Sequence, residues 1–498
     1  MGNAKLNNDK DASQGDSRAE ENNDSQAGET VTHPIASLAM SFIGRVNAMR
    51  LALRIAVPAT VDHFQTEADA YRKKFENHII EEDEKQFKVK IISDDVRKAT
   101  EIQTALDSYQ KLDAAGVIEA LERSLFIGLF SEFDAFMGSL LELIYNRKPE
   151  LFNEIKREIS LSELLQFGSI DAVRQDMLEK EIDSFRRDSY IEQFGVLEKK
   201  FNIKTLRKFH EWPSFVEMGQ RRNLITHNGG VVTEHYLSIC EREGVSFSNR
   251  PVGTKLKVEP KYFFSACAVL SSVAFMLVYT LWRKLFPHET KEANGCIQNS
   301  VYELLMQKHW GLAARLGDFS LSDEMKKGAD DLDVRIRHIN LAIAQNKCNL
   351  RDEMIRTLEA CDWSASVRDF KLAIAILKGE FSQAASLMRD IGKEGEIIDQ
   401  SAYHCWPLFL DFVNTHEFQS AYREVYGHDF SLQEVASETT VSVVDPTASA
   451  CDTAAISSAN ENTVVMPSAT KSRRSLAKKV GSDEDKIKRV RRTRKAND

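Results

Sequence analysis

Arg222 and His227 are the residues of this chain whose types and spacing best fit catalysis. They begin and end the stretch RNLITH, and the helix-stopping run NGG follows directly. Histidine titrates near neutral pH and can transfer protons, whereas arginine presents a rigid fork of N–H groups that suits phosphate oxygens. The two residues together therefore indicate chemistry on a phosphodiester.

The reaction that suits such a pair is cleavage of RNA by its own 2′-hydroxyl. That reaction needs a base for the hydroxyl, an acid for the leaving oxygen and a cation for the charge on the phosphorane. His227 would transfer protons, and Arg222 would stabilise the phosphorane. His227 ends the expected helix, where the helix dipole favours a cation, so it suits the acid better than the base.

A helix over 213–228 is expected to carry these residues, because proline suits its start and glycine its end. Within it, Asn223 and His227 are four residues apart and share a face. Followed backwards, that face becomes small and apolar and includes Gly219. The stripe is therefore expected to pack against a neighbour that Gly219 allows to come close.

The segment 117–145 is expected to be a central buried helix, because apolar residues cover two of its faces. Its central part carries only two charges, Glu132 and Asp134. Glu132 falls within an apolar stripe and needs a cationic partner, for which Arg222 and His227 are the candidates. For both acids, ion pairing that locks the bundle is favoured over a catalytic role.

The stretch Arg222–His227 resembles the R-x(4-6)-H signature of the HEPN superfamily, whose active members are metal-independent ribonucleases. The similarity covers roughly residues 115–290, with a buried acid-bearing helix, intervening helices, the motif helix and a further apolar helix, as in a helical HEPN bundle. The polar Asn223 after the arginine and the NGGVV run that follows the motif also fit.

This resemblance implies a catalytic role for Arg222 and His227 and a phosphate-binding or orienting role for Asn223. Glu132 is added to these from its place in the apolar stripe, as a supporting partner for Arg222 or His227. It also implies RNA as the substrate, no metal or cofactor, and a homodimer in which two motifs face one cleft. By analogy with the family, such an enzyme would act in defence or as a toxin.

Two alternatives stay open for the motif. Arg222 and His227 could form a structural pair, the arginine bridged to Glu132 and the histidine capping the helix. HEPN-like proteins also serve as non-catalytic dimerisation modules, so the alternative function is a scaffold that binds a protein partner.

The composition describes an ordinary globular protein that is long enough for two or three domains. The chain has 498 residues, of which 42% are hydrophobic and 28% charged. The 7 cysteines are scattered without metal-binding spacing and are expected to be reduced. The polar segment 1–32 is expected to be disordered and does not resemble a signal peptide, so a cytoplasmic location is favoured.

We expect an all-α fold, since the 10 prolines and 23 glycines are too few for a turn-rich β protein. The expected order is N-terminal helices over 33–114, the HEPN-like bundle over 115–290, a helical-repeat domain over 297–432, and a disordered linker with a basic tail over 437–498. A short hairpin-like excursion is expected within 231–258.

The repeat domain is inferred from three similar segments that begin at Leu312, Leu341 and Leu372, at intervals of 29 and 31 residues. Small residues at such a period are typical of a tetratricopeptide-like solenoid, although the tetratricopeptide consensus is not reproduced. Helix packing is the default explanation for these small residues, and a surface of the repeats that binds a protein partner is a secondary inference from solenoid geometry. Two closing helices are expected over 406–430.

Two further segments have alternative interpretations. The 21 residues 262–282 carry no charge and could span a membrane, but a buried bundle helix is favoured. The tail 471–495 holds twelve Lys and Arg against three acids, a net charge of +9, so the total of −9 leaves −18 for the rest of the chain. The tail could contact nucleic acid through phosphates, act only as a solubilising terminus, or mimic a nuclear import signal.

Overall fold

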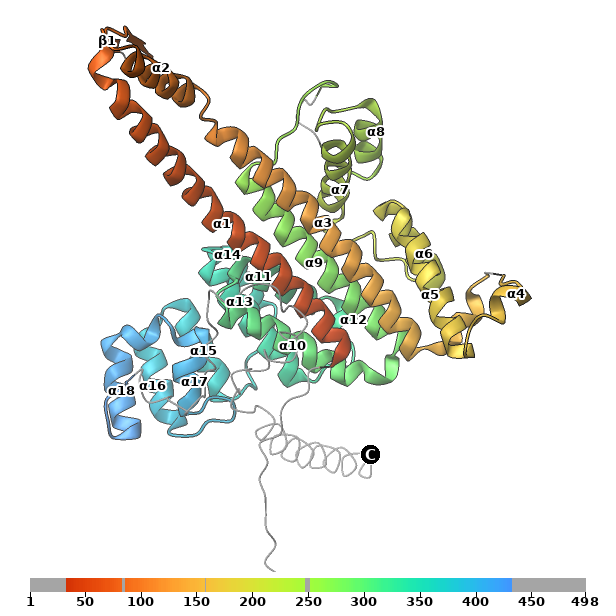
Figure 1. The fold of residues 1–498 in the computed structure, drawn as a ribbon. Helices are drawn as coiled ribbons and strands as arrows, with labels where there is room; N and C mark the ends of the chain where they lie inside the picture. The colour runs from red at the N-terminus through yellow and green to blue at the C-terminus, as the bar shows by residue number, and fades with distance from the viewer. Residues whose placement is uncertain (1–32, 83–85, 157, 247–250, 432–498) are drawn as a thin grey trace, which may run out of the picture. The chain divides into compact units, whose positions relative to one another are not determined.

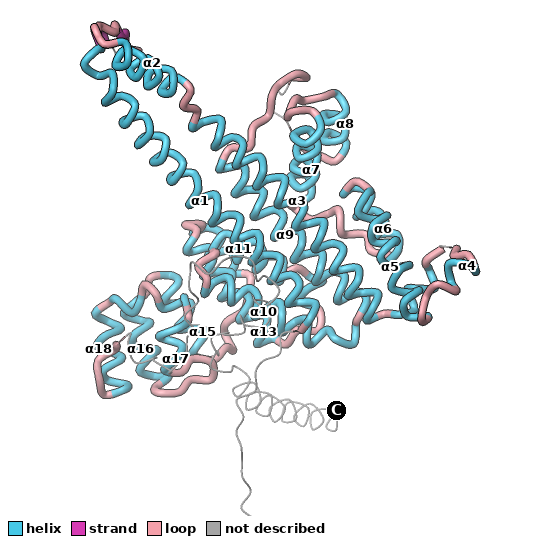
Figure 2. The backbone as a smooth tube through the Cα atoms, viewed as in Figure 1, coloured by secondary structure: helices cyan, strands magenta, loops and turns pink. Residues whose placement is uncertain are grey.

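Helices dominate the chain, as its composition predicts. The structure is a computed structural model and describes residues 33–82, 86–156, 158–246 and 251–431. Helices hold 74% of these residues and strands 3%, which confirms the all-α prediction (Figures 1 and 2). The termini that were expected to be disordered, together with the basic tail, lie outside the described residues.

Three long helices pack against one another: α1 (Pro34–Phe75), α3 (Ala114–Arg147) and α9 (Pro260–Leu285) (Figure 1). Helix α3 is buried along both of its apolar faces, as its sequence predicts, and its phenylalanines have no exposed surface. Helix α1 shares this core through the buried residues of its N-terminal half. Burial of these faces supplies most of the stabilisation, because helices alone are marginal in water.

A small hairpin interrupts the region that was expected to be entirely helical. Strands β1 (Ile79–Glu82) and β2 (Phe87–Val89) pair antiparallel between α1 and α2 (Val96–Gln110), after the 3-10 turn Glu76–His78. The rings of Phe75, Phe87 and Tyr109 pack against one another there, with centroids 5.5–5.6 Å apart. This aromatic cluster gives the hairpin the apolar support that an isolated two-stranded unit lacks.

Shorter helices follow α3 along the chain. These are the 3-10 helix Pro149–Glu154, α4 (Leu161–Leu164), α5 (Ile170–Arg187), α6 (Tyr190–Phe201), α7 (Trp212–His227) and α8 (Glu234–Arg242). The hairpin-like excursion expected within 231–258 is found in part. Val231 and Lys255 form an antiparallel bridge, and the Leu256 N–H donates to the Gly230 carbonyl beside it. The segment between them also holds α8, which Thr233 caps by accepting a hydrogen bond from the Tyr236 N–H.

The three similar segments of the C-terminal region each lie on a helix: α11 (Trp310–Ser320), α13 (Asp331–Lys347) and α15 (Arg368–Lys378). The second residue of each segment, Ala313, Ala342 or Ala373, has no exposed surface. Small residues at these positions therefore permit close helix packing. This agrees with the packing role that the prediction gave to the small residues.

The remaining elements of this region complete the described chain. They are the turn Pro287–Glu289, α10 (Thr290–Met306), α12 (Asp323–Lys326), α14 (Arg351–Glu359), α16 (Phe381–Ile391), α17 (Gln400–Cys405), the 3-10 turns η4 (Pro407–Phe409) and η5 (Phe412–Asn414), and α18 (His416–Tyr426). The expected closing pair over 406–430 consists of these two turns and α18.

Two segments of the described chain are long and apolar enough to cross a membrane, Val96–Arg147 and Pro260–Leu285. A core helix passes the same test of length and composition. In Pro260–Leu285, 78% of the most apolar window is buried inside the fold, where α9 contacts α1, α3 and α7.

Candidate active site

Helix α7 carries the predicted motif, and local signals set both of its ends. Pro213 lies in its first turn, where the N–H that proline lacks would have no helical partner. Gly229 and Gly230 follow with φ angles of 59° and 84°, which favour glycine. The Gly230 N–H donates to the Leu224 carbonyl at 2.9 Å and closes the last turn.

Arg222 is half-buried and held by two side chains. Its Nη2 donates to the Asp134 carboxylate of α3 at 3.2 Å, and its Nη1 donates to Asn223 Oδ1 at 3.0 Å. The Nε atom is buried and has no hydrogen-bond partner among the described residues. The guanidinium is therefore held through both of its Nη atoms, and its buried Nε–H has no acceptor among the described residues.

Asp134 is the anchor of this arrangement, and Tyr190 at the start of α6 supports it. The Tyr190 hydroxyl donates to Asp134 Oδ1 at 2.7 Å. Burial raises the pKa of Asp134, against the opposing effects of Tyr190, Arg222 and Arg186. Burial and the nearby carboxylate raise the pKa of Tyr190 far above its usual range, so the phenol remains a donor.

Glu132 does not contact the motif, so its expected partners were wrong. It accepts a hydrogen bond at 2.7 Å from Arg45 on α1, and both side chains are more than a third exposed. Positions 132 and 134 lie about 160° apart around the helix axis, so the two acids face different neighbours. The structural alternative named the right kind of contact for Arg222, an ion pair, but the wrong acid.

His227 is exposed at the end of α7, and no hydrogen bond joins its side chain to the described residues. The C-cap residue is Asn228, whose backbone N–H donates to the Leu224 carbonyl at 2.8 Å. The capping role considered for His227 is therefore not observed. An exposed imidazole without a partner can exchange protons with solvent or with a bound molecule.

A second, fully buried polar network lies beside the motif and involves Arg221. Its Nε and Nη2 donate to Glu217 Oε1 at 2.9 and 2.7 Å, and its Nη1 donates to the Lys257 carbonyl at 3.1 Å. The hydroxyls of Tyr236 and Tyr262 donate to the two oxygens of Glu217, each at 2.6 Å. This network joins α7 to α8 and α9.

The same network governs the ionisation of Glu217. Burial is the largest single influence and acts to raise its pKa, but Arg221 and the two tyrosines together outweigh burial and lower it. The sequence argument missed this network, although the spacing of Glu217 and Arg221, four residues apart in a helix, was a usable signal.

Gly219 does allow a close neighbour, and that neighbour belongs to the same chain. A Cβ atom at this position would lie 3.0 Å from a ring carbon of Tyr190. The residue is buried on the face of α7 that meets the Tyr190 ring, and the hydroxyl of this ring supports Asp134. It is therefore part of the packing behind the site and is not available as a surface for dimerisation.

The described residues contain no group of three or more His, Cys, Asp and Glu side chains that could hold a metal ion. Comparison with protein-family models, curated proteins and solved structures found no match for this chain. The function must therefore be argued from the site itself.

Proposed function

We propose that this chain is a metal-independent RNA endonuclease of the HEPN type that acts as a homodimer. One observation carries the proposal: the helix on which Asp134 holds Arg222 ends in an exposed histidine that makes no side-chain hydrogen bond to the described residues. A histidine that can transfer protons and an oriented guanidinium are two of the groups that phosphodiester cleavage uses.

In the proposed reaction, the 2′-oxygen of RNA attacks the adjacent phosphorus and the bond from phosphorus to the 5′-oxygen breaks. A base removes the 2′-hydroxyl proton, and His227 donates a proton to the leaving 5′-oxygen. Arg222 stabilises the charge on the phosphorane, and Asn223 orients the phosphate. The products are a cyclic phosphate and a 5′-hydroxyl. DNA lacks the attacking hydroxyl and is not a substrate.

The motif of one copy of the chain supplies one histidine, His227, to the reaction. The second proton-transfer group then comes from the motif of a second copy. The exposure of His227 supports this arrangement, because a partner can reach it without rearrangement of α7. A cleft formed by two motifs would contain two histidines and two arginines, enough for the base, the acid and the stabilising cation.

The Arg222–Asp134 ion pair favours a second candidate, a non-catalytic scaffold. A carboxylate that already pairs with the guanidinium reduces the charge available for a phosphate. In that case the motif helix would serve a structural purpose, and the C-terminal helices would bind a protein.

Incubation of the purified chain with end-labelled RNA in EDTA tests both candidates. We expect cleavage that His227→Gln and Arg222→Lys each lower by about 100-fold or more, the range of general acid–base and charge-stabilising effects. His235→Gln is the matched control, because His235 is also exposed and lies on α8. No cleavage by folded wild-type protein favours the scaffold.

A further inference from the structure

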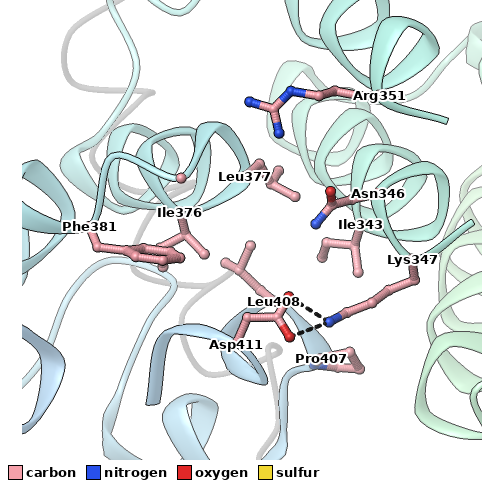
Figure 3. Close-up of a pocket in the computed structure, with 11 residues that line it drawn as sticks. Ile343, Asn346, Lys347, Arg351, Ile376, Leu377, Phe381, Pro407, Leu408 and Asp411 are labelled. Atoms are coloured by element: carbon pink, nitrogen blue, oxygen red, sulfur yellow. Dashed lines mark hydrogen bonds and ion pairs between the residues drawn. The ribbon is translucent and has the colours of Figure 1, made fainter. Parts of the chain in front are cut away.

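A small pocket opens among the C-terminal helices, on elements that take no part in the candidate active site. Its lining comes from the ends of α13 and α15, the starts of α14 and α16, and the turn η4 with the residues after it (Figure 3). Its volume is about 160 Å³. Pockets for drug-sized ligands begin at roughly 300 Å³, so this one suits a single small group.

Six residues of the lining are aliphatic or aromatic: Ile343, Ile376, Leu377, Phe381, Pro407 and Leu408. Four of these side chains are branched aliphatic groups from three separate elements. A small apolar group would be removed from water where it meets them, and the polar groups of the lining are left to bind the rest of the ligand.

The polar groups of the pocket favour an anion. Its charged residues are two cations, Lys347 and Arg351, and one carboxylate, Asp411. Lys347 Nζ already donates to both oxygens of Asp411, at 2.8 and 2.7 Å. Because these two charges neutralise each other, the charge that remains for a ligand is that of Arg351.

Arg351 and Asn346 have unused donors. Among the described residues, the Arg351 side chain makes one hydrogen bond, from Nη2 to the Lys378 carbonyl at 3.3 Å, and the Asn346 amide makes none. Figure 3 shows Arg351 at one end of the pocket and the Lys347–Asp411 pair at the other, with Asn346 between them. Arginine with a neighbouring amide is a suitable receptor for a carboxylate.

We propose that this pocket binds the C-terminal residue of a partner polypeptide. The aliphatic side chain of that residue occupies the apolar wall, and its carboxylate accepts hydrogen bonds from Arg351 and Asn346. A free amino acid fits less well, because its ammonium group needs an anion. Asp411 is the one carboxylate in the lining, and Lys347 already occupies it.

Titration of the full-length chain with N-acetyl-leucine, followed by saturation-transfer NMR, tests the proposal without any RNA. This probe mimics a C-terminal leucine. We expect saturable binding with a Kd on the order of 1 mM, as for a ligand of few atoms. N-acetyl-leucinamide, which lacks the carboxylate, and free leucine, which adds an ammonium, are each expected to bind at least about tenfold more weakly.

Two variants locate the binding. Arg351→Gln and Asn346→Ala are expected to weaken the binding of N-acetyl-leucine, the former by at least about tenfold. Arg356→Gln is the matched control, since this arginine lies on the same helix α14, is 69% exposed and does not line the pocket. Circular dichroism confirms that each variant is folded.

Three results would overturn the proposal: no saturable binding of N-acetyl-leucine, equal binding of its amide, or equal binding by folded Arg351→Gln. Binding of free leucine as tight as that of N-acetyl-leucine would reject a polypeptide as the source of the carboxylate.

Discussion

Nη2 of Arg222 on α7 lies 3.2 Å from Oδ2 of Asp134 on α3. This contact joins the helix that carries the motif to a central helix of the bundle, across 88 positions of sequence. Because Tyr190 holds the other oxygen of the same carboxylate, the position of the guanidinium depends on groups from three helices. Substitutions at Asp134 and Gly219 test that dependence.

Asp134→Asn should show that burial has a larger effect on the pKa of this carboxyl than its polar and charged partners have. Its pKa is raised by burial above the ordinary 3.8. A carboxyl with a raised pKa contributes stability that is complete below its unfolded pKa and is lost as the pH rises through its folded pKa. Wild type should therefore lose stability relative to Asp134→Asn as the pH rises above that ordinary value, measured by urea unfolding.

If the free energy of unfolding of wild type instead increases relative to that of Asp134→Asn as the pH rises, pairing with Arg222 outweighs burial. In the RNA cleavage assay, Asp134→Asn should be slower than wild type by about tenfold or more, because Arg222 loses its charged anchor.

Gly219→Ala should disturb the site through Tyr190. The added Cβ would lie 3.0 Å from the ring, which must shift together with its hydrogen bond to Asp134. We expect the free energy of unfolding to fall by about 1–3 kcal/mol, as for other overpacked sites. Gly195→Ala on α6 is the control, since its Cβ would meet nothing within 4 Å. Equal stability of both variants would refute the argument.

Glu217→Gln should destabilise the fold severely. Arg221 and Glu217 are 5% and 7% exposed, and loss of the negative charge leaves a buried guanidinium without a counter-charge. Loss of one partner of a buried pair costs about 3–5 kcal/mol, which urea unfolding can measure. Glu241→Gln, on the exposed surface of α8, should stay within about 0.5 kcal/mol of wild type. A loss below about 1 kcal/mol for Glu217→Gln contradicts this account.

Glu132→Gln should leave RNA cleavage unchanged, although the sequence argument placed this residue in support of the motif. Its partner is Arg45 on α1, and a partly exposed pair of this kind contributes less than about 1 kcal/mol. Parallel assays of Glu132→Gln and Asp134→Asn separate the two acids of α3. A large loss of activity in the former alone would reverse their assignments.

The elements themselves were largely predictable, because their signals are local. Proline and glycine residues bracket α7, and an uncharged apolar run marks α9. Such signals act over a few residues, through backbone geometry and burial of a periodic face. The hairpin-like excursion expected within 231–258 was only partly right, because a Thr cap and the helix α8 lie between the residues that pair.

The sequence by itself determined an all-α chain with a helix that ends in a histidine and carries an arginine five residues earlier. Only the tertiary structure decided that Asp134 and not Glu132 meets Arg222, and that Glu217 and two tyrosines enclose Arg221. The rotation of α3 about its axis chooses between two acids about 160° apart, and that rotation is set by packing against α1, α7 and α9. No residue within one turn of either acid carries that information.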